Sequence, residues 1–184
     1  MGIGLSGETE KALSYLLNNY KGRLIIDADG LTALSRIGTD ILKTASCEVI
    51  LTPHNMEFSR ISGLSINAIL SAPVDHAKAF AKEYGCTLLL KGPSTIVTDG
   101  EAVYIVDRGC VGMATAGSGD VLSGILAATA AYILSPLEAT TLAAYINGAA
   151  GESAQSKTNP ISMTASDTVA AIPEIISKII NTEA

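Results

Sequence analysis

The chain has 184 residues, which is enough for one domain with a sizeable core. Apolar residues make up 48% of it and charged residues 16%, so the composition excludes a disordered chain. A net charge of -6 argues against passive attraction to nucleic acid or to an anionic membrane, but not against a locally positive ligand site.

The first elements alternate between helix and strand. The periodicity predicts an amphipathic helix from Glu8 to Tyr20. A short apolar strand follows at 24–26, and its brevity and composition suit burial on both faces. A short helix is predicted from Gly30 to Ile37, with Asp29 as its cap.

The middle of the chain repeats this alternation. Glu48–Leu51 is predicted as a second buried strand, and a helical pair is predicted from Asn55 to Tyr84, broken near Pro73. Thr87–Leu90 is predicted as a third buried strand.

The last part begins with a predicted hairpin. The strands Thr95–Thr98 and Ala102–Val106 flank Asp99-Gly100, a strong turn signal. A glycine-rich loop follows from Gly109 to Gly119. Three helices are then predicted, over Ser118–Leu134, Pro136–Ser153 and Ser166–Ile180.

Alternating buried strands and helices predict one α/β domain over residues 1–184, with a mostly parallel sheet covered by helices on both faces. Ligands of such folds bind at the carboxyl ends of the strands. Thr52-Pro53-His54 and Lys91-Gly92 follow two predicted strands, so we expect these polar clusters to converge.

The cysteines and the apolar runs bear on location. The three cysteines have no C-x-x-C spacing, which indicates reduced thiols and a cytoplasmic setting. No run reaches the roughly 18 apolar residues of a membrane-spanning helix, and the first six residues lack the features of a signal peptide. We expect neither a membrane nor a nucleic-acid partner.

The most specific segment runs from Gly112 to Gly124. Gly117 and Gly119 flank the start of an apolar helix, where free N–H groups and the helix dipole favour a phosphate. A carboxylate beside such an anion is unfavourable, so Asp120 is a candidate general base acting on a hydroxyl. The alternative is ordinary capping, with Ser118 as the N-cap and Asp120 favoured by the dipole.

Two strand ends carry further candidates. Lys91 followed by Gly92 suits a phosphate contact, and Thr95 could hydrogen-bond a phosphate, although a solvated lysine is a common alternative. His54 and Glu57 lie three residues apart at a helix start, so His54 could contact a substrate and Glu57 could hold a magnesium-bound water. A capping arrangement from Thr to Glu explains the same pattern.

Two other polar segments receive no functional role from the sequence. Asp27-Ala28-Asp29 is equally compatible with capping and with a functional strand end. The run from Tyr145 to Gly148 lies on an apolar helix and is predicted to belong to the core.

Taken together, these runs resemble the NAD(P)H-hydrate dehydratases of the ribokinase-like superfamily. The matching segments appear in the family's order across nearly the whole chain: Gly2-Ile3-Gly4-Leu5-Ser6, Asp27 to Leu31, Thr52 to Glu57, Lys91-Gly92-Pro93-Ser94-Thr95, and Gly112 to Gly124. Asn55 and Met56 replace the family's Pro-Gly, and Ser6 replaces a glycine. The resemblance therefore does not define the backbone shape beside His54.

The resemblance implies a three-layer ribokinase-like fold and an enzyme that repairs hydrated NADH or NADPH. ADP or ATP, with Mg2+, would phosphorylate the hydrate hydroxyl, and loss of phosphate would restore the reduced dinucleotide. Asp120 would act on that hydroxyl, Gly4 and His54 would line the hydrate site, and Glu57 would hold the metal through water. The implied nucleotide-binding residues are Lys91, Gly92, Pro93, Ser94, Thr95, Met113, Ala114, Thr115, Gly117, Ser118 and Gly119.

Against the family pattern, the sequence begins well into the fold, which implies an N-terminally truncated domain. The mean hydropathy of +0.37 fits uncovered apolar surface. We therefore expect a homo-oligomer or a companion chain. Two other functions remain compatible: a small-molecule kinase of the same superfamily, and an inactive nucleotide-binding subunit.

Overall fold

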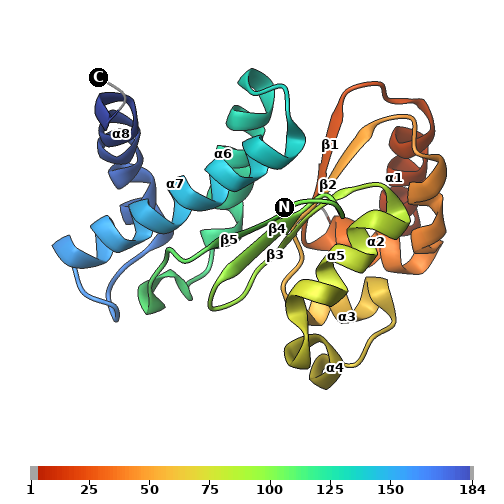
Figure 1. Ribbon diagram of the computed structural model, residues 1–184, viewed down its shortest axis with the longest axis horizontal. Coiled ribbons are helices and arrows are strands. Elements are labelled where there is room, and N and C mark those ends of the chain that lie inside the picture. Colours follow the sequence, from red (N-terminus) through yellow and green to blue (C-terminus); the bar gives the residue numbers. More distant parts are fainter. Residues whose placement is uncertain (1–3, 183–184) are drawn as a thin grey trace.

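The computed structural model describes residues 4–182. One sheet of five strands forms the middle layer, in the order β1-β2-β3-β4-β5 (Figure 1). β1, β2 and β3 pair in parallel, β4 is antiparallel to β3, and β5 is antiparallel to β4. Only β4 therefore runs against the others, as a mostly parallel sheet requires. The strands are β1 (Arg23–Ile26), β2 (Glu48–Leu51), β3 (Thr87–Leu90), β4 (Thr95–Thr98) and β5 (Val103–Val106).

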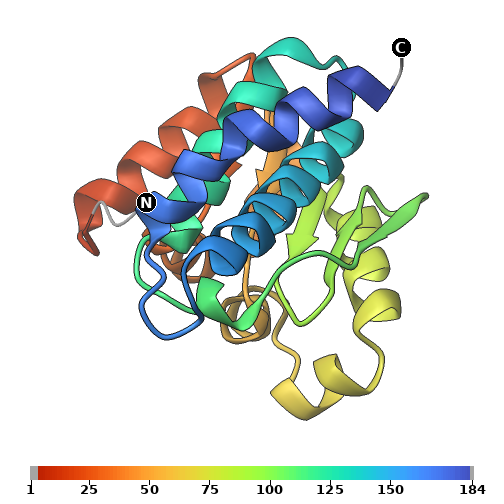
Figure 2. The ribbon, with the colours of Figure 1, turned by 90° about the vertical axis from the view of Figure 1, so that its left-hand side faces the viewer.

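Helices cover both faces of this sheet, which gives the predicted three layers (Figures 1 and 2). The helices on one side are α1 (Gly7–Asn19), α2 (Asp29–Ile37), α3 (Asn55–Ser62), α4 (Ile66–Ser71) and α5 (Pro73–Tyr84). On the other side lie α6 (Ser118–Tyr132), α7 (Pro136–Lys157) and α8 (Ala165–Thr182). α7 contacts β2 to β5, α6 contacts β1, and α8 packs on α7 from outside (Figure 2).

The core shows why these short apolar runs form strands. Leu88 and Leu90 of β3 pack with the α1–α5 side, whereas Leu89 between them packs with the α6–α7 side. Ile50 of β2 points to α6 and α7 in the same way. Because successive side chains of a strand point to opposite faces, only an unbroken apolar run can serve a sheet covered on both sides.

Two local expectations were wrong, and two short 3-10 turns were not predicted. The predicted helical pair is three helices, because Gly63 ends α3 in the left-handed conformation and Ser65 caps α4 before Pro73 starts α5. Asp29 is the first residue of α2 rather than its cap: Ala28 holds the cap position and makes no side-chain bond. The short 3-10 turns η1 (Thr39–Thr44) and η2 (Val111–Met113) have no apolar periodicity that would predict them.

Of the helices within residues 4–182, none is both long enough and apolar enough to cross a membrane.

Candidate functional site

The carboxyl ends of β1, β2 and β3 meet at one edge, as the parallel order requires. The backbone N–H of Lys91 donates to the carbonyl of Pro53 at 2.8 Å, and a bridge joins Lys91 to His54. The Lys91 ammonium lies 2.9 Å from Asp27 Oδ1 and 3.9 Å from Glu57 Oε2. The two predicted clusters therefore do converge, with Lys91 between two carboxylates.

Asp27 is a site residue that sequence reasoning missed. Its side chain is only 8% exposed, and Ser123 Oγ donates to its second oxygen at 3.2 Å. Burial alone would raise the pKa of Asp27, but the charge of Lys91 and hydrogen bonds from Lys91 and Thr52 outweigh it and hold that pKa below its usual value. The next residue, Ala28, has φ of 50°, and strained backbone of this kind concentrates at functional sites.

His54 and Glu57 form a reciprocal cap at the start of α3. His54 Nδ1 accepts from the N–H groups of Met56 and Glu57, and Glu57 Oε2 accepts from the His54 N–H at 2.9 Å. The cap residue is thus His54, and Thr52 is fully buried below it. The imidazole remains half exposed at the site edge, so it is open to a ligand while it caps the helix.

Gly4 is tied to the same edge. Its N–H donates to Asp29 Oδ2 at 2.9 Å, and its carbonyl accepts from Thr9 Oγ1 at 2.7 Å. Its φ of 85° requires the freedom of glycine. Met1 to Ile3, which include the start of the predicted turn, lie outside the described residues.

The glycine-rich loop places the N-terminus of α6 at this edge. Gly117, with φ of 90°, holds the N-cap position, so Ser118 is the first helical residue and not the cap. A Cβ on Gly119 would lie 3.7 Å from Asp27 Oδ2, which places the helix start beside that carboxylate. Asp120 follows in the first turn and is exposed. The start of α6 therefore lies beside Asp27, the partner of Lys91, whereas the side chain of Asp120 lines a separate hollow between α6 and α8.

A cavity of about 590 Å³ opens next to Lys91. Its lining includes Lys91 and Arg108 and no carboxylate, and each cation has its carboxylate partner outside this lining, Asp27 for Lys91 and Glu152 for Arg108. Such a cavity favours an anion of nucleotide size. Of the predicted nucleotide residues, Lys91, Gly92, Pro93, Thr95, Met113 and Ala114 line it. Ser94, Thr115, Gly117, Ser118 and Gly119 are not part of its lining, and Ser94 Oγ lies 3.3 Å from Asp107.

The far wall of this cavity is α7, which the sequence assigned to the core. Ile146 and Gly148 are indeed buried, but Asn147 lines the cavity and Tyr145 is exposed. A Cβ on Gly148 would lie 2.6 Å from Arg108 Cβ, so only glycine lets the helix and the loop approach so closely. The cavity therefore depends on small residues of α7 that carry no charge signal.

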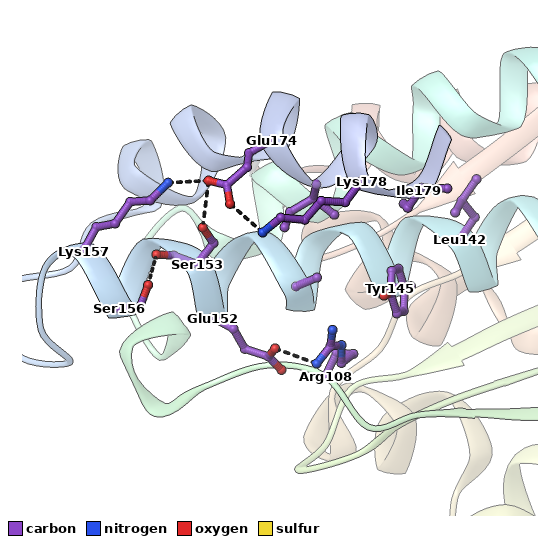
Figure 3. Close-up of a pocket in the computed structure, with 12 residues that line it drawn as sticks. Arg108, Leu142, Tyr145, Glu152, Ser153, Ser156, Lys157, Glu174, Lys178 and Ile179 are labelled. Atoms are coloured by element: carbon purple, nitrogen blue, oxygen red, sulfur yellow. Dashed lines mark hydrogen bonds and ion pairs between the residues drawn. The ribbon is translucent and has the colours of Figure 1, made fainter. Parts of the chain in front are cut away.

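A second cavity, of about 620 Å³, lies between α7 and α8 (Figure 3). Here the carboxylates themselves line the cavity: Glu152 lies 3.0 Å from Arg108, and Glu174 lies 2.6 Å from Lys178. Hydrogen bonds from Lys157 and Lys178 lower the pKa of Glu174 to about 2. The pair of Lys157 with Glu174 joins α7 to α8, and the carboxylates in its lining make this larger cavity the weaker candidate for an anion.

Comparison with known proteins places the chain in a family. The family model described as NAD(P)H-hydrate dehydratase matches residues 1–174. A bifunctional NAD(P)H-hydrate repair enzyme from Hyperthermus butylicus is 35% identical, over 96% of this chain and 33% of its own. An ADP-dependent (S)-NAD(P)H-hydrate dehydratase from Cenarchaeum symbiosum is 37% identical, over 96% of this chain and 60% of its own. The chain thus spans between a third and three fifths of these relatives.

A solved structure agrees at the level of the fold. The ADP/ATP-dependent NAD(P)H-hydrate dehydratase from Bacillus subtilis, co-crystallised with ATP and Mg2+, superposes with a TM-score of 0.84 at 23% identity, over 96% of this chain and 62% of that one. The predicted ribokinase-like fold is confirmed, and the chain belongs to the NAD(P)H-hydrate dehydratase family.

Proposed function

We propose that the chain catalyses the ADP- or ATP-dependent dehydration of hydrated NADH or NADPH. The observation that carries this proposal is the 590 Å³ cavity, which is lined by Lys91 and Arg108 without a carboxylate and opens beside the edge where α6 begins. This cavity would hold the nucleotide, and the N–H groups at the start of α6 would hold its terminal phosphate. The names of the relatives support the substrate.

Asp120 would supply the proton transfer. Its carboxylate takes the proton of the hydrate hydroxyl, and the oxygen attacks the terminal phosphorus of the nucleotide. The bond from phosphorus to the bridging oxygen breaks, so that ADP leaves as AMP, or ATP as ADP. The phosphorylated carbon then loses phosphate, and a proton leaves the neighbouring carbon to restore the ring double bond. Gly4 and His54, on the same edge, would contact the hydrate.

Mg2+ would be held mainly by the nucleotide phosphates. No group of three His, Cys, Asp or Glu side chains in residues 4–182 could form a dedicated metal site. Mg2+ usually keeps several waters and binds through one or two carboxylates and phosphates, so this donor set fits it. Glu57, whose side chain is 10% exposed beside Lys91, is the residue that would hold a metal-bound water. Bound there, the ion would neutralise charge on the transferring phosphoryl group.

The decisive experiment is a repair assay. The chain is incubated with NADH-hydrate, Mg2+ and ADP or ATP, and the absorbance of the reduced nicotinamide is followed. We expect a rise that requires the nucleotide and is matched by free phosphate. A stable phosphorylated product would instead identify a small-molecule kinase, and nucleotide binding without turnover would identify an inactive subunit.

We further propose that a second chain covers the β1 edge, which would give the working protein a complete sheet. β1 is the outer strand, and an apolar groove of about 330 Å³ runs beside it between α1 and α6. α6 carries a single charged residue, Asp120, yet Gly124, Ala127 and Ala128 on it are exposed. A helix that is apolar all round is normally buried, and an open edge strand normally pairs. The greater length of the relatives agrees with such a covering layer.

This proposal predicts a purified mass above the 18.9 kDa of one chain. Ala127→Glu should reduce association, because the new carboxylate would have to be buried in the contact. The matched control is Ala79→Glu, an equally exposed alanine of α5 on the other side of the sheet. Light scattering after size exclusion measures the mass. A monomer with full repair activity would contradict the proposal, and a whole multiple of the chain mass would identify a second copy.

The free cysteines Cys47, Cys86 and Cys110 agree with a reducing setting, and we propose the cytoplasm.

A further inference from the structure

Asn147 is a polar side chain on an otherwise apolar helix wall. It lines the 590 Å³ cavity between Ala144 and Gly148, with Leu122 of α6 as a further apolar neighbour. Its side-chain oxygen Oδ1 is buried and has no hydrogen-bond partner among the residues that the structure describes. A buried polar atom without a partner is costly, so its place in a ligand cavity calls for a reason beyond packing.

Residues next to Asn147 on α7 contact Arg108, which lies in the loop after β5. Gly148, the next residue, packs directly on the backbone of Arg108. The Arg108 guanidinium lies over the ring of Tyr145 at 5.3 Å and pairs with Glu152 at 3.0 Å (Figure 3). One turn of α7 therefore fixes the loop through Tyr145 and Gly148, and Asn147 on the same turn lines the cavity. Because the backbone at this position is held, only the side chain of Asn147 has to be ordered when it engages a ligand.

The rest of the lining offers different contacts to the phosphates and to the base of a nucleotide. Lys91 and the exposed backbone at Gly92 suit phosphates, whereas Pro93, Val111 and Leu122 offer apolar surface for the faces of a base. Thr95 and Asn147 are the uncharged polar side chains of this lining, apart from the thiol of Cys110. Of these two, Asn147 alone has the paired donor and acceptor that match the edge of a base.

We propose that Asn147 reads the base of the bound nucleotide and selects adenine. Rotation of the amide towards the cavity would let Oδ1 accept from the 6-amino group of adenine while Nδ2 donates to a ring nitrogen, the pairing by which asparagine recognises adenine elsewhere. On the edge that carries N7, guanine presents two acceptors, O6 and N7, so in either orientation of the amide one of them would face Oδ1. This inference rests on the proposed nucleotide-dependent function and adds its base specificity.

The test replaces Asn147 with leucine, which has a similar size and no polar atoms. Binding of ADP, GDP and inorganic tripolyphosphate is measured by calorimetry in the presence of Mg2+. We expect about tenfold weaker binding of ADP, since a hydrogen-bonding pair is lost, and an ADP-to-GDP preference that shrinks accordingly. Tripolyphosphate, which has no base, should bind the variant and the wild type equally.

A purely structural role predicts something different. If Asn147 serves ligand binding, its replacement removes a buried atom without a partner, and the thermal midpoint should stay unchanged or rise. If Asn147 has a structural role, the thermal midpoint of Asn147→Leu should fall. Asn19→Leu, at an exposed asparagine of α1, is the matched control and should affect neither binding nor its selectivity. In the repair assay, Asn147→Leu should raise the KM for ADP and leave kcat nearly unchanged.

Unchanged ADP affinity in Asn147→Leu would overturn the proposal, and so would an equal loss for ADP and tripolyphosphate. A wild-type chain that prefers ADP over GDP but restores no NADH would separate the two ideas: the base selectivity would stand and the dehydratase function would fall. A wild-type chain without any preference for adenine would contradict base recognition by Asn147, even if turnover is observed.

Discussion

Replacing Asp120 with asparagine is expected to lower kcat of the repair reaction by about a thousandfold or more. The new amide cannot take the proton of the hydrate hydroxyl, yet it has nearly the same shape as the carboxylate. Asp120 is exposed in the first turn of α6, so the fold should lose only its favourable contact with the helix dipole, about 0.5 kcal/mol. Nucleotide binding should be kept or become tighter, because a negative charge beside the phosphates is removed.

The chain offers a closely matched control for this variant. Asp75 is the third residue of α5, just as Asp120 is the third residue of α6, and both are exposed. Asp75→Asn should therefore cost similar stability and no activity. If Asp120 acts only as a helix-start residue, the two variants will show the same kcat, and the catalytic assignment will be wrong. Rates at saturating substrate, with thermal midpoints of both variants, decide between these outcomes.

Sequence predicted this fold well where the pattern is local. β2 and β3 have the predicted bounds because strands buried on both faces must be unbroken apolar runs. The convergence of His54 with Lys91 followed from the parallel order alone, since that order sets all carboxyl ends at one edge. These inferences needed only periodicity and the topology that it implies.

The missed residues owe their positions to contacts that no local pattern encodes. Asp27 faces Lys91 across 64 positions of sequence, and nothing in Asp27-Ala28-Asp29 shows which carboxylate turns inward. Asn147 resembles a tolerated polar residue in a core helix until the cavity beside it is known. His54 was not expected as a cap, because imidazole is not among the preferred capping groups.

The departures from the family pattern beside His54 prove to be compatible with its geometry. Asn55 is the first residue of α3, the helical position where proline is best tolerated, so either residue starts the helix. Met56 is 58% exposed, so its side chain has room where the family has glycine. The N–H of Met56 donates to His54 Nδ1 at 3.1 Å, so this residue takes part in the helix cap.

Lys91→Met should have the second large effect, on stability and on nucleotide affinity together. Methionine keeps the apolar stem but leaves the carboxylates of Asp27 and Glu57, which are 8% and 10% exposed, without their cation. Removing one partner of a buried ion pair is costly, and we expect the free energy of unfolding to fall by about 2 kcal/mol or more near neutral pH. Loss of the phosphate contact should also weaken ADP binding by at least about tenfold.

The pH dependence tests whether the buried carboxylate of Asp27 is a source of the stability loss. In the wild type the pKa of Asp27 is lowered, so its contribution is present above the carboxyl pKa of the unfolded chain, about 4, and is lost as the pH falls through the folded value. In Lys91→Met, burial remains while the cation is gone, and the pKa of Asp27 should rise. The difference in unfolding free energy between the two proteins should therefore shrink as the pH falls below about 4.

Urea unfolding near pH 7 and below about pH 4 measures this difference. Lys11→Met is the control, because Lys11 pairs with Glu8 at 3.0 Å on an exposed surface. This substitution should change the free energy of unfolding negligibly at either pH. A loss in Lys91→Met that does not change with pH would mean that packing of the lysine stem, and not the buried carboxylates, accounts for it. A loss confined to neutral pH, together with weak ADP binding, would show that one ammonium stabilises the strand ends of the free protein and contacts the phosphates of the bound nucleotide.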